Sequence, residues 1–183
     1  MDAKLIEFLE TTHNLEQELN FLAKNFDDKI VFSTSFGIED QVITHSIFSQ
    51  NIKNIEVFTL DTGRLFAETY AVWDKTLLQY NKKIKAYYPN AEKTENYVNT
   101  NGINAFYNSV ELRKECCFIR KVEPLGRALN GAKVWITGLR AEQSENRNTL
   151  KKIDWDADRQ LYKYNPLINW TTAEVVAYLK KFG

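Results

Sequence analysis

The stretch KIVFSTSFGIEDQVITHSIFSQ, residues 29–50, decides the fold. It begins with a short run of β-branched and aromatic residues, which predicts a buried strand over residues 29–33. A helix over residues 39–50 is predicted by apolar side chains at helical spacing, namely Val42, Ile43, Ile47 and Phe48. A strand that leads directly into a helix is the repeating unit of an open parallel α/β sheet.

The same alternation continues along the chain. One or two amphipathic helices are predicted before this stretch. Further strands are predicted over residues 55–60, 84–88 and 133–137, and further helices over residues 66–80 and 116–129. The pattern predicts a single α/β domain over residues 1–183, with a parallel sheet that carries helices on both faces.

The pattern changes after Arg140. A polar loop is predicted over residues 141–149, and a hairpin over residues 151–155 and 161–164. Thr171 and Glu174 form a T-x-x-E capping box, which predicts a short final helix. We expect the apolar face of that helix to be exposed, on Val175, Val176 and Leu179.

Composition narrows the classes of function. Lys and Arg total 24, as do Asp and Glu, so no overall charge favours nucleic acid or an anionic membrane as a partner. The sequence has no apolar run of membrane-spanning length and no signal-peptide pattern, and we expect a cytoplasmic protein. His13 and His45 are its only histidines, which disfavours multi-histidine metal sites and Ser-His-Asp hydrolysis. His45 is interpreted as an ordinary helix residue, and Trp135 and Trp155 as packing residues.

Three polar segments follow predicted strands: STSFGIED (33–40), LDTGR (60–64) and GLRAEQSENR (138–147). In an open parallel sheet, ligands bind outside the carboxyl ends of the strands. Each segment alone is also compatible with a solvated turn. Their small hydroxyl residues, glycines and arginines at the same sheet edge together favour an anionic ligand of nucleotide size.

The adjacent cysteines Cys116 and Cys117 are the only ones in the sequence. Neighbouring cysteines do not readily form a disulfide with each other, because ordinary disulfides require a larger Cα separation. They are either two small buried residues or a pair of thiolate ligands, such as iron–sulfur clusters use. Four basic residues surround the pair and would stabilise thiolates: Arg113, Lys114, Arg120 and Lys121. Two ligands are too few for a four-iron cluster.

Taken in order, STSFGIED, LDTGR, ECCFIRKVEPL, TGLRAEQSENR and LYKYNPLINWTTAEV resemble the adenylyl-sulfate and phosphoadenylyl-sulfate reductase family. The similarity runs from about residue 29 to the last residue. It implies an adenine nucleotide α-hydrolase-like fold. It also implies reduction of adenylyl sulfate to sulfite and AMP, or of phosphoadenylyl sulfate to sulfite and PAP, with thioredoxin as the electron donor.

The resemblance also implies roles for individual residues. Those that would contact the sulfonucleotide are Ser33, Ser35, Gly37, Leu60, Asp61, Gly63, Arg64, Gly138, Arg140 and Arg147. Cys116 and Cys117 match two of the four ligands of a 4Fe–4S cluster, and Lys121 matches a lysine between cluster and substrate. The cysteine pair favours adenylyl sulfate over its 3′-phosphorylated form.

Two family motifs are missing from these 183 residues, and we expect both beyond Gly183. They are a C-x-x-C that completes the cluster and an E-C-G-x-H that carries the nucleophilic cysteine. We therefore expect a C-terminally truncated reductase that binds nucleotide and does not turn over. One alternative is an ATP pyrophosphatase or a relative of the sulfate adenylyltransferase small subunit, although STSFGIED lacks the lysine of their S-G-G-K-D-S-like loop. Another is a non-catalytic nucleotide-binding remnant.

Overall fold

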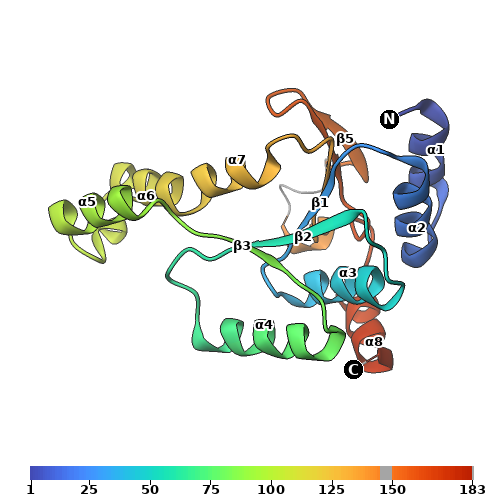
Figure 1. Ribbon diagram of the computed structural model, residues 1–183, viewed down its shortest axis with the longest axis horizontal. Helices are drawn as coiled ribbons and strands as arrows, with labels where there is room; N and C mark the ends of the chain where they lie inside the picture. The colour runs from blue at the N-terminus through green and yellow to red at the C-terminus, as the bar shows by residue number, and fades with distance from the viewer. Residues whose placement is uncertain (145–149, 183) are drawn as a thin grey trace.

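The computed structural model describes residues 1–144 and 150–182 (Figure 1). Among these residues, one six-stranded sheet has the order β3-β2-β1-β4-β6-β5. The strands are β1 (Ile30–Ser33), β2 (Ile55–Leu60), β3 (Lys85–Tyr87), β4 (Val134–Ile136), β5 (Ile153–Asp156) and β6 (Leu161–Tyr164). Neighbouring strands are parallel except for the β5–β6 hairpin. The predicted parallel α/β sheet and the hairpin are both confirmed.

The order of the strands reverses beside β1. The chain proceeds outward from β1 through β2 to β3 and then returns to the other side of β1 to form β4. β1 therefore pairs in parallel with β2 on one side and with β4 on the other. In open α/β sheets, the crevice at such a reversal is where ligands bind.

The two faces of the sheet carry separate hydrophobic clusters. In β1, Ile30 and Phe32 belong to the larger cluster and Val31 to the second, as side-chain alternation along a strand requires. The larger cluster packs against α1 (Ala3–Thr11), α2 (Leu15–Asn25), α3 (Ile38–Ser49), α4 (Ala67–Tyr80) and α8 (Thr172–Phe182). The second packs against α7 (Glu123–Leu129), which lies on the opposite side of the sheet from α3 and α4 (Figure 1). The expectation of helices on both faces is confirmed.

A third, smaller cluster lies in a helical arm, residues 91–122, at one end of the molecule (Figure 1). The arm contains α5 (Ala91–Asn101), η1 (Ala105–Tyr107), α6 (Val110–Cys117) and the π-helical turn η2 (Phe118–Val122). The predicted helix over residues 116–129 therefore begins earlier, at Val110. The Ser109 hydroxyl fixes this start by accepting a hydrogen bond from the Leu112 amide at 3.2 Å.

The C-terminal helix α8 is longer than expected, with 11 residues. Its capping box is confirmed, since the Thr171 amide donates to Glu174 at 2.7 Å and the Glu174 amide donates to the Thr171 hydroxyl at 3.2 Å. The expectation of an exposed apolar face is wrong for Val175, which is fully buried, and for Leu179, which packs partly buried against the same cluster. The α8 helix packs on α3, a contact between elements far apart in sequence. No helix in the described residues is long and apolar enough to span a bilayer.

Candidate nucleotide-binding site

A cavity of about 510 Å³ opens at the carboxyl ends of β1, β2 and β4. This volume falls within the range of small-molecule sites. The cavity brings together several residues that were predicted from the sequence: Ser33, Ser35, Gly37, Leu60, Lys121 and Gly138. It does not include Asp61, Gly63, Arg64, Arg140 or the two cysteines among its lining residues.

Two of the sequence-based expectations fall on residues that the structure does not describe. Arg147, a predicted phosphosulfate contact, lies outside the described residues. So does Gly183, beyond which the nucleophilic cysteine and the C-x-x-C are expected. The contact by Arg147 and the cysteine motifs beyond Gly183 therefore stay predictions.

The loop between β1 and α3 is held in one conformation by its own side chains. The Ser35 amide and hydroxyl both donate to Oδ2 of Asp40, at 2.6 and 2.7 Å. Phe36 has a left-handed backbone with φ of 64° and stacks on Trp73 of α4, with ring centroids 5.3 Å apart. Gly37 caps α3, so the first turn of that helix faces the cavity and its amides favour an anion there.

Asp40 links this loop to the loop after β4. Burial raises the pKa of the Asp40 carboxyl, and the two hydrogen bonds from Ser35 oppose that rise. Gly138 lies directly against this carboxyl group: a Cβ added there would overlap it. The two loops can approach this closely only because residue 138 has no side chain.

The turn after β2 is stabilised internally. Asp61 is buried, and its carboxylate accepts from the Gly63 amide at 2.8 Å and from the Tyr70 hydroxyl at 2.9 Å. Gly63 has a positive φ of 69°, which glycine adopts without strain. Asp61 and Gly63 therefore shape the turn, while the neighbouring Leu60 and Thr62 line the cavity.

Arg64 joins this turn to the helical arm. Its guanidinium donates to the Ile103 carbonyl and to Oδ1 of Asn104, each at 3.0 Å, and lies 4.8 Å from the centre of the Phe106 ring. From the opposite direction, Arg120 donates to the Thr62 carbonyl at 2.6 Å. These contacts fix the arm against the sheet edge next to the cavity.

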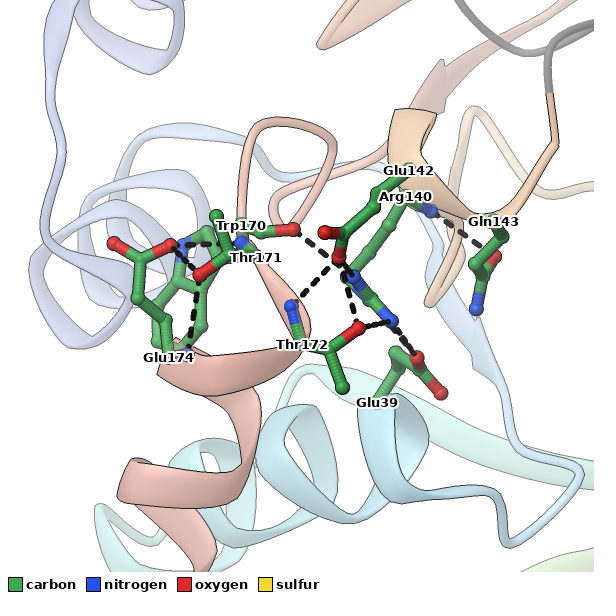
Figure 2. Close-up of polar contacts among 8 residues, drawn as sticks. All are labelled: Glu39, Arg140, Glu142, Gln143, Trp170, Thr171, Thr172 and Glu174. Atoms are coloured by element: carbon green, nitrogen blue, oxygen red, sulfur yellow. Dashed lines mark hydrogen bonds and ion pairs between the residues drawn. The ribbon is translucent and has the colours of Figure 1, made fainter.

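Arg140 is not among the residues that line the cavity. Its guanidinium instead points toward Glu39, Glu142 and Thr172 (Figure 2). Its Nε and Nη2 contact Oε1 of Glu39 at 2.9 and 2.8 Å. Nη1 donates to Glu142 at 2.6 Å and to the Trp170 carbonyl at 3.1 Å, and Nη2 donates to the Thr172 hydroxyl at 3.1 Å. Burial by itself would lower the pKa of Arg140, but the hydrogen bonds from its guanidinium to Glu39 and Glu142 raise it above its usual value.

The cysteines lie at the end of α6, in the helical arm. Cys116 is buried in the arm's cluster beside Tyr97, and Cys117 is exposed. Within the described part of the chain, no group of three or more His, Cys, Asp and Glu side chains could hold a metal ion. The pair thus offers half of the thiolate set of a four-iron cluster. Lys121 follows within the π-helical turn and lines the cavity, so the arm brings the cysteine helix to the edge of the site.

Sequence reasoning missed several residues of the cavity wall, among them Trp135 and Lys163. Trp135 was interpreted as a packing residue, but it also lines the cavity, and its indole N–H donates to the Ser33 hydroxyl at 2.9 Å. Lys163 lines the cavity because β6 pairs with β4, which places it in register with Trp135. No sequence signal indicated that the hairpin would add to the sheet at β4.

The mostly parallel six-stranded sheet places the chain in the adenine nucleotide α-hydrolase-like class of α/β folds. The same fold occurs in an NH3-dependent NAD synthetase from Campylobacter jejuni, with a TM-score of 0.57 at 14% identity, over 99% of this chain and 73% of that one. The predicted fold class is confirmed.

Residues 29–183 match the phosphoadenosine phosphosulfate reductase domain. An adenosine 5′-phosphosulfate reductase from Burkholderia cepacia is 48% identical over 155 residues, 85% of this chain and 62% of that protein. A phosphoadenylyl-sulfate reductase from Candida auris, solved as a phosphate complex, superposes with a TM-score of 0.80 at 25% identity, covering 99% of this chain and 87% of that one. The chain belongs to the phosphoadenosine phosphosulfate reductase family. It spans about three fifths of the length of the curated relatives it matches.

Proposed function

We propose that the cavity binds adenylyl sulfate, and that the chain takes part in reducing it to sulfite and AMP with thioredoxin as the electron donor. The observation that carries the proposal is the cavity itself. It lies at the strand-order reversal and joins a Ser/Gly loop, the first turn of α3 and the ammonium group of Lys121. Phosphoadenylyl sulfate is the second substrate of the same class.

The cavity wall offers different chemistry to the two ends of such a ligand. The leucines Leu60 and Leu125 and the indole of Trp135 supply apolar surface suited to an adenine ring. Ser33, Gly37, Gly138 and Lys121 supply a hydroxyl, close backbone approach and positive charge for the phosphosulfate. Ser35 shapes the loop beside them, since its amide and hydroxyl both donate to Asp40. Four predicted site residues would hold these lining residues in place without lining the cavity themselves, namely Asp61, Gly63, Arg64 and Arg140. Arg147 remains a predicted phosphosulfate contact.

The proposed reaction needs a nucleophile besides the residues of the cavity. In the family mechanism, a cysteine thiolate attacks the sulfur of adenylyl sulfate, a sulfur–sulfur bond forms, and the sulfur–oxygen bond breaks as AMP leaves with the electron pair. A thioredoxin thiolate then attacks the cysteine sulfur, the sulfur–sulfur bond breaks, and sulfite leaves with the electron pair. The second thiol of thioredoxin reduces the resulting mixed disulfide, which leaves thioredoxin oxidised and the cysteine free. Lys121 would stabilise the negative charge that develops on the leaving phosphate. Cys116 and Cys117 are assigned to the cluster, so neither supplies the attacking thiolate, which the resemblance expects beyond Gly183.

Cys116 and Cys117 would supply two of the four thiolate ligands of a 4Fe–4S cluster. The other two would come from the C-x-x-C that the resemblance leads us to expect beyond Gly183. The cluster would add a local electrostatic field beside Lys121. Reconstitution with iron and sulfide tests this assignment on a chain that extends through the expected C-x-x-C, because two ligands are too few for a four-iron cluster. We expect wild type to retain more iron than the C116S/C117S variant; equal iron in both would contradict it.

Isothermal titration of the chain with adenylyl sulfate tests the proposed function. Lys121→Ala should weaken binding about tenfold, because a charge-assisted contact to an anion is lost. Lys114→Ala, at an exposed position on α6 outside the cavity, is the matched control and should bind as wild type does. Binding of ATP in preference to adenylyl sulfate would instead favour the ATP pyrophosphatase alternative. With reduced thioredoxin we expect no sulfite from the 183-residue chain, since it lacks a third cysteine.

A further inference from the structure

We propose that Arg140 is a positioning residue of the nucleotide site and does not contact the phosphosulfate. It locks the loop after β4 to the first turn of α3 and to the start of α8. This inference rests on the proposed function, because the site it positions is the proposed sulfonucleotide site. It departs from the role that the family resemblance implied for this arginine.

The first argument is that the donors of Arg140 are exhausted. A guanidinium has five N–H groups. Nε and Nη2 serve Glu39, Nη1 serves Glu142 and the Trp170 carbonyl, and Nη2 also serves Thr172. The residue is only 4% exposed and does not line the cavity. A phosphosulfate oxygen could bind it only by displacing an acceptor that is already present.

The second argument is that Glu142 is itself fixed (Figure 2). Its Oε2 accepts from the Thr172 amide at 2.7 Å and from the Thr172 hydroxyl at 2.8 Å, in addition to Arg140. The hydrogen bonds from Thr172, followed by the one from Arg140, lower the pKa of Glu142 below its usual value. The carboxylate therefore stays charged near neutral pH and holds Arg140 to the N-terminus of α8.

The third argument concerns what the guanidinium holds in place. Glu39 lines the cavity, and the next residue, Asp40, anchors Ser35. Gly138, two residues before Arg140, lies against the Asp40 carboxyl group. One side chain thus clamps together two walls of the cavity, the loop after β1 and the loop after β4.

Three variants separate positioning from direct contact. Arg140→Met removes the clamp, and Glu142→Gln weakens it from a position outside the cavity. Glu174→Gln is the matched control, because Glu174 also caps the start of α8 but bonds Thr171 instead of Arg140. Affinities for adenylyl sulfate, AMP and uncharged adenosine are measured for each variant at several salt concentrations.

If Arg140 is a positioning residue, Arg140→Met should weaken adenylyl sulfate and AMP about five- to thirtyfold with an unchanged salt dependence. Adenosine should lose less, because the clamped loops line the part of the cavity assigned to the phosphosulfate. Glu142→Gln should reproduce part of that loss, and the double variant should lose little more than Arg140→Met alone. Glu174→Gln should bind as wild type does. The proposal is overturned if Glu142→Gln has no effect, or if it strengthens binding of the two anions, as freeing a guanidinium donor that contacts them directly would do.

Hydrogen exchange keeps the test independent of the proposed function. If the wild-type chain binds none of the three ligands, the proposed function fails, and the clamp can still be judged in the free protein. The Ser35 amide, which donates to Asp40, should exchange faster in Glu142→Gln than in wild type or Glu174→Gln. Equal exchange in all three would overturn the positioning role.

Discussion

Replacing Gly138 with alanine should damage stability and nucleotide binding together. An added Cβ would overlap the Asp40 carboxyl group and come within 3.2 Å of the Cβ of Glu39. Gly138 does not have a positive φ, so its requirement is steric and arises from the approach of two loops. Asp40 can yield only by giving up the hydrogen bonds from the amide and hydroxyl of Ser35, at 2.6 and 2.7 Å.

The size of the effect follows from these contacts. Forcing a methyl group into a packed position costs about 1–3 kcal/mol. Each hydrogen bond to a charged group contributes about 1.5–3 kcal/mol, and part of that is lost when the Asp40 carboxylate moves. We expect Gly138→Ala to lower the free energy of unfolding by about 2–4 kcal/mol. Gly126→Ala is the matched control, because a Cβ there meets nothing within 4 Å, and alanine in helix α7 should stabilise by about 0.5–1 kcal/mol.

Urea unfolding followed by tryptophan fluorescence measures both changes. The midpoint for Gly138→Ala should fall by about 1–2 M at an unchanged slope, and adenylyl sulfate should bind more weakly. Asp40→Ala makes room for the methyl group, so the double variant should lose less than the sum of the single losses. A Gly138→Ala protein as stable as Gly126→Ala, or strictly additive losses in the double variant, would refute the proposed clash.

Three further predictions concern the rest of the molecule. Lys152→Met leaves the buried Glu18 carboxylate without its cation at 2.8 Å and should cost about 3–5 kcal/mol in urea unfolding, whereas Lys151→Met at an exposed position should change stability by less than about 0.5 kcal/mol. Burial lowers the pKa of His45, so protons bind the unfolded chain more tightly and stability is lost as pH falls below about 6.5; His45→Gln should flatten the melting temperature between about pH 7 and pH 5. Gly63→Ala places a side chain at φ of 69° and should cost about 1–2 kcal/mol, and an unchanged urea midpoint would show that this turn can relax.

The sequence predicted those elements of the fold whose burial requires a regular pattern of apolar residues. Central strands such as β1 and β2 are short apolar runs because both of their faces are covered, and the polar segments that follow them mark the sheet edge. Helix α5 was not predicted, because it buries little besides Tyr97 and packs in the arm rather than on the sheet. The π-helical turn within the predicted 116–129 helix left no signal in the apolar spacing.

For the site, position at the end of a strand identified several residues that line the cavity. It could not distinguish them from residues that only hold the lining residues in place. Arg140 and Lys121 are both basic residues near strand ends or helix starts, yet of these two only Lys121 lines the cavity. What fixes Arg140 are acceptors from three separate segments, including Glu39 and Thr172, and their proximity arises only on folding. Lys163 was missed for the same reason, since its place depends on β6 pairing with β4.

The motifs after β1 and β4 interlock at two points. Gly138 leaves room for Asp40, and Arg140 forms an ion pair with Glu39. A G-x-R sequence on the loop after β4 therefore packs against an E-D pair in the first turn of α3. Gly138 permits the close approach of the two segments, and the ion pair between Arg140 and Glu39 keeps them together. The shape of the cavity therefore depends on both motifs. Ser35 takes its position from the same contact, through Asp40. Two segments that sequence patterns assign separately to phosphate contact therefore act as one unit. A change at Gly138, Arg140, Glu39 or Asp40 should alter the geometry offered to the nucleotide.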